Sequence, residues 1–307
     1  MASGEEEIIK EWSSVIPFDE RDPSLLFEFV EELGMAHTAK KKDTNETFLI
    51  QTYEVNQYLR RVHNEYLAMS KCEHEKIAKF YGSYLKENRI WIVLEYCAEG
   101  NVVDLMEDLE LEEGLKEEEI KFIIRHVLLG LQYLHTKGTY HGDVKANNIL
   151  LTDNGEVKLD AVCHRDRNFG DEQGAPYHMA PEVMSVLEYG PAADVWALGI
   201  TAIELAENYP EIFDLPPLRF LFLFSTRSEP PKLTKSPESF SKEFHDFISK
   251  CLVKEKKDRW DVEMLMNHPW LGEKNKNDDD ESPLMQTIMK RRWLKMEGGG
   301  VKPAKRK

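Results

Sequence analysis

The sequence predicts an α+β protein with two unequal parts, a small part made mainly of strands and a larger part made mainly of helices. Three observations lead to this fold class. An alternating apolar run at 26–33 predicts a first strand in the N-terminal third, and two further strands are predicted there at 77–85 and 89–97. A long amphipathic helix is predicted over 115–137, and an almost wholly apolar pattern over 195–207 indicates a helix through the middle of a domain. The length of 307 residues suits a two-lobed domain with short tails.

The composition excludes several classes of protein. The formal net charge of −16 argues against general nucleic-acid binding. No apolar run is long enough to cross a bilayer, and residues 1–7 lack the basic and apolar regions of a signal peptide, so we expect no membrane partner. The four cysteines are scattered without metal-ligand spacing, which indicates reduced thiols in a cytoplasmic protein: Cys72, Cys97, Cys163 and Cys251.

The most informative motif is a polar loop that runs into an apolar strand at residues 140–151. His141, Asp143, Lys145 and Asn148 stand there in an order and spacing that resemble the catalytic loop of protein kinases. In that loop the aspartate accepts the proton of the attacking hydroxyl, the lysine steadies the γ-phosphate, and the asparagine holds a metal ion. The resemblance therefore implies catalytic positions at Asp143, Lys145 and Asn148.

Three residues with structural roles in kinases follow this loop. Glu182, in an Ala-Pro-Glu motif, has a candidate ion-pair partner in Arg259. Asp194 opens the apolar helix. The resemblance implies a buried Glu182–Arg259 bridge and an intact framework for the larger lobe.

Residues 22–270 as a whole resemble sterile-20 protein kinases, and the runs 81–86 and 199–207 are most similar to germinal-centre kinase subgroup III. The resemblance implies the bilobal protein-kinase fold. It divides the chain into an acidic N-terminal extension at 1–25, a kinase-like domain at 26–271 with lobes at 26–97 and 98–271, and a C-terminal tail at 272–307.

The positions that hold nucleotide in active kinases depart from the family pattern. Only Gly34 remains of the glycine-rich loop, Gln51 replaces the lysine that grips the phosphates, and Leu49 replaces a small alanine beside adenine. Leu49 would overpack the adenine slot, and overpacking typically costs about 1–3 kcal/mol of free energy. A helix is predicted over 51–71, where Glu65 is either the usual partner of the lost lysine or a solvated glutamate. The degenerate nucleotide site consists of Gly34, Gln51, Glu65, Glu95 and Cys97.

The metal-binding Asp-Phe-Gly triplet of kinases is missing. By the family spacing its three positions are Ala161, Val162 and Cys163. Asp160 lies one residue earlier, and a one-residue shift in a strand points a side chain to the opposite face. A bulge that returned Asp160 to the metal is the minority alternative. The candidate metal ligands are therefore Asn148 and, more weakly, Asp160.

These departures predict a pseudokinase that acts as a scaffold or allosteric partner in kinase signalling, with an active kinase or an adaptor as its protein partner. No cofactor is expected, and the retained catalytic positions are predicted to be without function. The alternative is a residual or atypical Ser/Thr kinase that transfers the γ-phosphate of Mg-ATP to protein hydroxyls. In that case Asp160 would supply the metal ligand, and one of three neighbouring lysines would replace the lost one: Lys40, Lys41 or Lys42.

The tail at 282–295 resembles the basic, tryptophan-bearing helix that follows the kinase domain in the same subgroup. An acidic run at 278–281 precedes it and basic residues lie within it, which favours a helix through its macrodipole. Two positions stay open for this helix: on its own C-lobe, or in a groove of an adaptor or a second kinase-like chain. Trp293 is the predicted partner-binding residue, because buried tryptophans often dominate interfaces.

Overall fold

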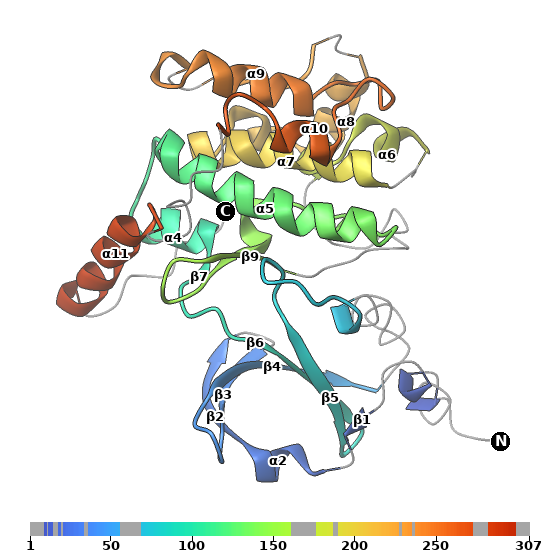
Figure 1. The fold of residues 1–307 in the computed structure, drawn as a ribbon, viewed down its shortest axis with the longest axis vertical. Helices are drawn as coiled ribbons and strands as arrows, with labels where there is room; N and C mark the ends of the chain where they lie inside the picture. The colour runs from blue at the N-terminus through green and yellow to red at the C-terminus, as the bar shows by residue number, and fades with distance from the viewer. Residues whose placement is uncertain are drawn as a thin grey trace. The chain divides into compact units, whose positions relative to one another are not determined.

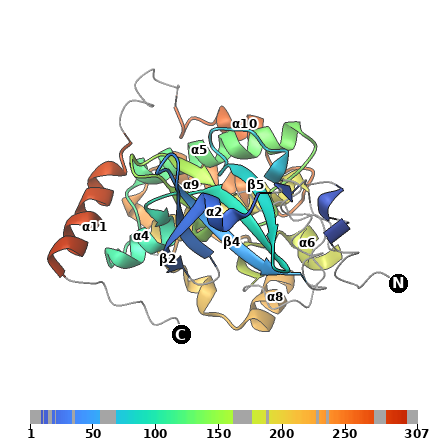
Figure 2. The ribbon, with the colours of Figure 1, turned by 90° about the horizontal axis from the view of Figure 1, so that it is seen from below.

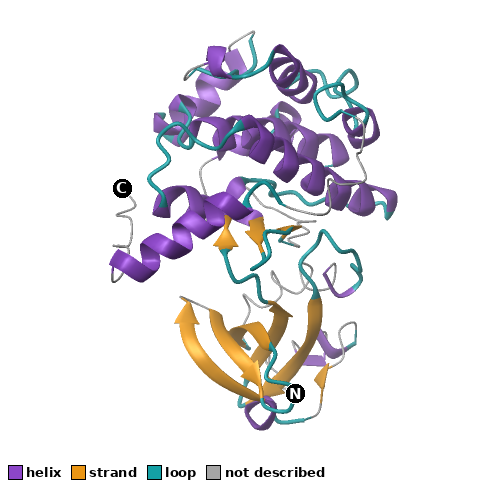
Figure 3. Ribbon diagram, turned by 60° about the vertical axis from the view of Figure 1, so that its left-hand side comes forward, coloured by secondary structure: helices purple, strands orange, loops and turns teal. Residues whose placement is uncertain are grey.

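The computed structural model describes residues 9–10, 12–14, 18–19, 21–33, 36–55, 69–160, 176–186, 190–226, 229–234, 237–272 and 282–298. The chain divides into two compact units, and each is described by itself. The N-lobe holds the described residues up to Cys97, and the C-lobe holds those from Ala98 onward. Strands dominate the first unit and helices the second (Figure 3). The predicted α+β class is therefore confirmed.

The N-lobe is built on one curled sheet of six strands in the order β1-β5-β6-β4-β3-β2 (Figure 1). β1 runs parallel to β5, and all other neighbouring pairs are antiparallel. A short helix, α2, lies between the first two strands in the sequence. The bounds are Phe18–Asp19 for β1, Pro23–Leu26 for α2, Phe27–Leu33 for β2, Ala36–Lys41 for β3, Thr47–Glu54 for β4, Phe80–Lys86 for β5 and Arg89–Glu95 for β6.

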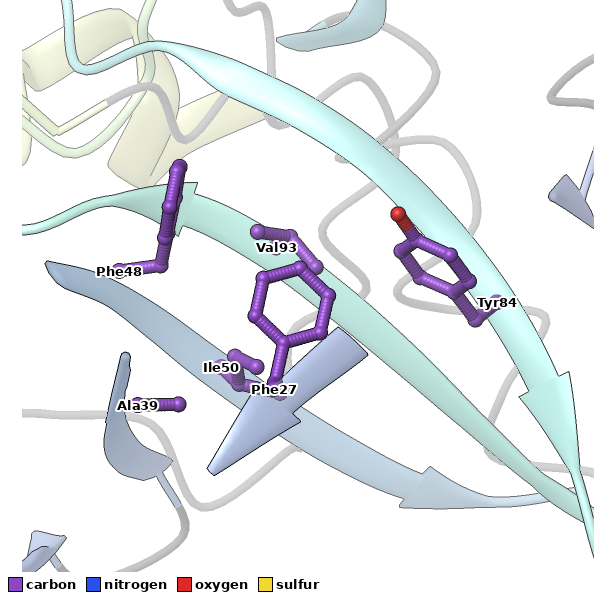
Figure 4. Close-up of a cluster of buried hydrophobic side chains, with 6 residues drawn as sticks. All are labelled: Phe27, Ala39, Phe48, Ile50, Tyr84 and Val93. Carbon is purple, nitrogen blue, oxygen red and sulfur yellow. The ribbon is translucent and has the colours of Figure 1, made fainter. Parts of the chain in front are cut away.

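Alternating side chains of β4 separate the N-lobe core from the opposite face of the sheet. Phe48 and Ile50 are buried in the core, whereas Leu49 and Gln51 point to the other face and are half-buried. Side chains from five strands fill the core, as Figure 4 shows: Phe27, Ala39, Phe48, Ile50, Tyr84 and Val93. Leu49 and Gln51 thus share one face, the face opposite to the hydrophobic core.

Two details of this sheet differ from the sequence prediction or extend it. The pairing of β2 with β3 reaches Leu33 and Ala36, so only two residues connect the strands. β4 continues to Glu54, so the helix predicted from residue 51 is wrong over 51–54; its remainder, including Glu65, lies mostly outside the described residues.

The N-terminal extension contributes to the N-lobe sheet, which no sequence pattern indicated. Phe18 and Asp19 pair in parallel with Ser83 and Tyr84 at the edge of β5. Trp12 is buried and stacks on Phe18, with ring centroids 6.3 Å apart. An unpaired edge strand is a template for association with other chains, and this short strand covers one such edge.

The C-lobe consists of helices and a small sheet of three strands in the order β7-β8-β9. Its strands are β7 Gly100–Asn101, β8 Ile149–Leu151 and β9 Val157–Leu159. Its α-helices are α4 Val102–Asp108, α5 Glu117–Thr136, α6 Pro181–Val186, α7 Pro191–Glu207, α8 Pro217–Thr226, α9 Lys242–Cys251, α10 Val262–Met266 and α11 Met285–Gly298. Four short 3₁₀ turns are η1 Ala146–Asn148, η2 Pro176–His178, η3 Glu211–Asp214 and η4 Pro237–Ser239.

Helix α7 forms the centre of the C-lobe core. It is apolar on nearly every side, and 15 of its residues from Ala193 to Glu207 are buried. α5 packs on one side of it and α9 on another. Gly199 allows the closest approach to α9, because an added Cβ would lie 2.7 Å from the Cβ of Cys251. A helix buried in this way gives the loops around it a rigid base.

In the part of the chain that the structure describes, no helix combines the length and the apolar character that crossing a lipid bilayer requires.

Candidate functional site

The loop at residues 140–148 is held in place by one buried carboxylate of α7. Asp194, only 1% exposed, accepts hydrogen bonds from the backbone amides of His141 (2.8 Å) and Gly142 (2.7 Å). Nε2 of His135, at the end of α5, lies 2.8 Å from the same carboxylate. Gly142 has φ +81°, a left-handed conformation that favours glycine. Two amide contacts to one side chain therefore fix the start of the loop, and His135 links the same carboxylate to α5.

The structure brings Asp143, Lys145 and Asn148 together. Oδ2 of Asp143 lies 3.0 Å from Nζ of Lys145 and accepts a hydrogen bond of 3.0 Å from Nδ2 of Asn148. The same Nδ2 donates to the backbone carbonyl of Asp143 at 2.8 Å. A lysine and an amide thus contact one carboxylate, which is the arrangement expected of a group that accepts hydrogen bonds or a proton.

A second buried carboxylate supports the middle of this loop. Oε2 of Glu204, on α7, accepts a hydrogen bond from the amide of Ala146 at 3.0 Å and lies 3.0 Å from Nε2 of His178. His178 belongs to the turn η2, whose Tyr177 stacks on Phe213 at 5.0 Å. Sequence reasoning missed the His178–Glu204 contact, because a lone histidine in a loop gives no signal of its partner.

Asp160 continues the β8–β9 ladder without a bulge. Ile149 pairs with Leu159, and the amide of Asp160 then donates to the carbonyl of Asn148 at 2.9 Å, in the same register. The imidazole of His141 contacts the carbonyl oxygen of Asp160. Leu159 is buried, so regular alternation places Asp160 on the other face of the strand. Ala161, Val162 and Cys163 lie outside the described residues.

The N-lobe carries the described part of the predicted nucleotide positions. Gln51 lies opposite Ala36 and Ile92 in the sheet, and its Oε1 accepts a hydrogen bond of 3.1 Å from the hydroxyl of Tyr53. Oε2 of Glu95 accepts a hydrogen bond of 3.0 Å from the amide of Lys79. Cys97 is buried at the end of the lobe. Gly34 and Glu65 lie outside the described residues.

The three lysines near the β3–β4 hairpin lie away from Gln51 along the sheet. Lys40 pairs with Thr47, four residues before Gln51, which corresponds to about 13 Å along a strand. Nζ of Lys41 lies 3.5 Å from Asp43, and Nζ of Lys42 donates to the carbonyl of Ser24 at 2.9 Å. These contacts draw Lys41 and Lys42 toward the far end of β3.

The structure places Glu182 and Arg259 in a bidentate ion pair. Nη1 of Arg259 lies 2.7 Å from Oε1 of Glu182, and Nη2 lies 3.0 Å from Oε2. The guanidinium also donates to the carbonyls of Ala192 and Val253 and lies 5.1 Å from the ring centroid of Trp196. The Arg259 side chain is fully buried. This pair joins α6 to the chain that follows α9.

Helix α11 docks on its own C-lobe through ion pairs. Nε of Arg291 lies 2.6 Å from Oδ2 of Asp108, and Nζ of Lys295 lies 3.0 Å from the same oxygen. Nε of Arg292 donates to Oε1 of Glu99 at 2.8 Å. Burial raises the pKa of Asp108, but hydrogen bonds from Lys295 and Arg291 outweigh this and hold the pKa below its ordinary value.

Apolar contacts complete the docking of α11 and define its inner face. Leu284 and Ile288 are fully buried, and the hydroxyl of Thr287 donates to Glu119 of α5. Trp293, in contrast, is 55% exposed. Of the two positions that the sequence left open, the structure has the helix on its own C-lobe. The predicted role of Trp293 in partner binding stays a prediction.

Asp108→Asn should loosen α11 at neutral pH. The substitution removes the charge that Arg291 and Lys295 share, and leaves the buried Arg291 with only the more distant carboxylate of Glu99, 3.7 Å away, as its counter-ion. We expect amide hydrogen exchange over 285–298 to become about tenfold faster. Acid should act in the same direction. A carboxylate with a lowered pKa stabilises the docked state above its ordinary pKa, and this stabilisation is lost as the pH falls through the lowered value, below about pH 4.

Glu107→Gln is the matched control for this experiment. Glu107 is the neighbouring acid on α4, and it is exposed. Its loss should leave the exchange of α11 unchanged. Equal acceleration in both variants would mean that general charge, rather than the Asp108 ion pairs, holds the helix.

Comparison with known proteins identifies the class to which this fold and this loop belong. The protein kinase domain family matches residues 32–271, so the chain belongs to the protein kinase family. The predicted bilobal kinase fold is thereby confirmed.

Sterile-20-type serine/threonine kinases are among its relatives. The chain is 36% identical over 266 residues to "Serine/threonine-protein kinase cst-1" of Caenorhabditis elegans, covering 82% of this chain and 52% of that protein. It is also 36% identical over 266 residues to "Serine/threonine-protein kinase 4 homolog A" of Dictyostelium discoideum, covering 82% and 56%. Homolog B of the same organism is 36% identical over 272 residues, covering 85% and 24%. The chain spans about half or less of the length of these relatives. Its assignment to germinal-centre kinase subgroup III stays a prediction.

Proposed function

We propose that this chain is a pseudokinase of the sterile-20 type, which acts in the cytoplasm as a scaffold or allosteric partner of an active kinase or an adaptor. The observation that carries the proposal is the neutral side chain of Gln51 on β4. By the family resemblance it stands where kinases have the phosphate-gripping lysine, and its neutral amide accepts a hydrogen bond from Tyr53. An amide offers no positive charge to a triphosphate, and one well-placed electrostatic group is commonly worth about 10²–10³ in rate.

The positions of the neighbouring lysines support this proposal against rescue by another cation. Lys40 is about 13 Å from Gln51 along the sheet. This distance exceeds what a lysine side chain spans from its backbone, about 6 Å for four methylenes and the ammonium group. Lys41 and Lys42 contact Asp43 and Ser24 instead. Leu49, on the same face as Gln51, adds bulk where the family has a small residue.

The residues of the predicted metal site also support the proposal. The register of the β8–β9 ladder is unbroken through Asp160, so the bulge that would re-aim this side chain is absent up to that residue. The family position for the metal aspartate is Ala161, which has no oxygen on its side chain. Mg-ATP, the cofactor of the family, would supply the transferable phosphate. The residues present offer it neither the lysine nor the main metal ligand.

Such a protein retains the framework of the C-lobe. Asp194, Glu204 and Glu182 still hold the loop and the helices in their places. A framework of this kind presents rigid surfaces to other proteins without any chemistry. The cluster of Asp143, Lys145 and Asn148 is the observation that favours the second candidate, a residual Ser/Thr kinase.

Mg-ATP should not stabilise this protein. A ligand at a hundred times its dissociation constant raises the free energy of unfolding by about 2.7 kcal/mol. We expect no shift of the melting temperature with ATP at millimolar concentration, with or without magnesium, because charge, space and metal ligand are all missing. Thermal unfolding in the presence and absence of magnesium measures this. A shift that requires magnesium would favour the residual kinase.

A stepwise repair serves as the positive control. Gln51→Lys with Ala161→Asp restores the two charged groups but leaves Leu49 in place, so nucleotide binding should still be absent. Adding Leu49→Ala should be needed before a thermal shift appears. Substrate phosphorylation by the double variant alone would show that Leu49 does not obstruct the site.

A further inference from the structure

Helix α11 has apolar residues on two opposite faces. Its inner face, with Ile288, is buried on the C-lobe, as is Leu284 directly before the helix. Three other residues are spaced by four and three, so they form one stripe on the opposite side of the helix. These residues are Met289, Trp293 and Met296, which are 59%, 55% and 81% exposed. We call them the outer stripe. A helix that only packs on its own domain needs one apolar face, so the outer stripe is unexplained by the fold.

The docking contacts fix the direction of the outer stripe. Arg291 and Arg292 hold α11 to Asp108 and Glu99, so the helix cannot roll without breaking these ion pairs. α11 lies beside α4 at the rim of the C-lobe in two views at right angles (Figures 1 and 2). The outer stripe therefore faces away from the C-lobe. Contiguous exposed apolar side chains of this kind mark interaction sites.

The charges beside the outer stripe indicate which partner fits. Lys290 and Glu297 are exposed, seven residues apart, and lie along the same flank of the stripe. Among the described residues neither of them forms an ion pair. One end of the stripe is therefore basic and the other acidic. Such a surface is complementary to itself when two copies meet in opposite directions.

We propose that the outer stripe of α11 packs against the same stripe of a second copy of this chain, as an antiparallel helix pair. The twofold axis passes near Trp293. In that register Met289 lies within about one position of Met296 of the second copy. Lys290 lies within about one position of Glu297 of the second copy. A twofold interface uses one patch twice, so both ion pairs form together. This interface is independent of nucleotide and of the lost catalytic groups.

The size of the stripe sets the strength of the dimer. A standard interface buries about 800 Å² on each partner, and three side chains supply only part of that area. The dimer should therefore be weak and reversible, with a dissociation constant in roughly the micromolar range. Such a dimer responds to local concentration, for example when a common partner gathers several copies.

Sedimentation velocity of the full chain over a concentration series from about 1 to 200 μM tests the proposal. We expect a reversible monomer–dimer equilibrium. Trp293→Ala should raise the dissociation constant at least about tenfold, because a central tryptophan anchors an interface. Met264→Ala is the matched control: Met264 is 53% exposed on α10, far from the stripe in sequence, and its loss should leave the equilibrium unchanged. Thermal unfolding checks that both variants fold like the parent.

Charge reversal tests the antiparallel register. Lys290→Glu and Glu297→Lys should each weaken self-association, since each places like charges opposite one another in both ion pairs. An equimolar mixture of the two variants should associate at least as well as the parent, because every pair then has opposite charges. Two outcomes would overturn the proposal: a monomer at all concentrations, or two variants whose mixture stays as weak as each alone. Binding of the monomer to phosphatidylserine vesicles, abolished by Trp293→Ala, would instead assign the stripe to an anionic membrane and overturn it as well.

Discussion

Glu182→Gln should lower the melting temperature by roughly 6–20 °C. Removing one partner of a buried ion pair typically costs about 3–5 kcal/mol, because the other charge stays buried. In a domain of this size each kcal/mol corresponds to about 2–4 °C. The Arg259 side chain is fully buried, and its two contacts with Glu182 are 2.7 and 3.0 Å long. Glutamine keeps the shape of the side chain, so the loss measures the charge.

The surface pair of Glu229 and Lys232 is the control for this substitution. The two charged groups lie 3.7 Å apart, but both side chains are largely exposed, Glu229 at 79% and Lys232 at 75%. Glu229→Gln should change the free energy of unfolding by less than about 1 kcal/mol. Thermal unfolding of the two variants under the same conditions gives the comparison. A similar small loss in both would mean that the carbonyls around Arg259 satisfy its charge without Glu182.

Gly114→Ala should destabilise the C-lobe by about 3 kcal/mol, which corresponds to roughly 6–12 °C. Gly114 has φ +72°, and an added Cβ would lie 2.5 Å from the carbonyl oxygens of Leu205 and Ala206. The left-handed backbone accounts for about 1 kcal/mol and the displaced backbone of α7 for the rest. The amide of Leu115 donates to the carbonyl of Leu205 at 2.8 Å, so the clash falls on a contact that joins this loop to α7.

Gly138→Ala separates the two causes. Gly138 has φ +70°, nearly the same conformation, but nothing lies within 4 Å of its added Cβ. This variant should lose only about 1 kcal/mol, from backbone strain alone. Calorimetric unfolding of both variants measures the difference. Equal losses would show that α7 moves aside without cost.

The C-lobe could be predicted well from the sequence because its signals are local. The helix predicted over 115–137 is α5, Glu117–Thr136, and the apolar helix predicted over 195–207 lies within α7. Helical periodicity and buried apolar side chains act along a few turns, so a single stretch of sequence carries the information. Asp143, Lys145 and Asn148 were also close in sequence, and the structure places them in contact.

Contacts between distant segments were harder to predict. The pairing of Phe18 with Ser83 depends on a free sheet edge, which no property of residues 18–19 reveals. The helix predicted from residue 51 is wrong over 51–54, because these residues pair with β6 as part of β4 despite the polar groups of Gln51 and Tyr53. Among the site residues, the Glu204–His178 contact spans 26 positions and has no motif. Such pairs follow from tertiary packing, which overrides local preference.

The long-range contacts of α11 also bear on how the chain is assembled during synthesis. Its hydrogen bonds join residues that are 183 and 193 positions apart, Arg291 with Asp108 and Arg292 with Glu99. Closing loops of this length is entropically costly before other contacts form, and chains emerge from the ribosome with their N-terminal parts first. The acids that receive α11 are therefore made long before the helix itself. Until Arg291 and Arg292 have been made, Asp108 and Glu99 cannot have these cations as partners.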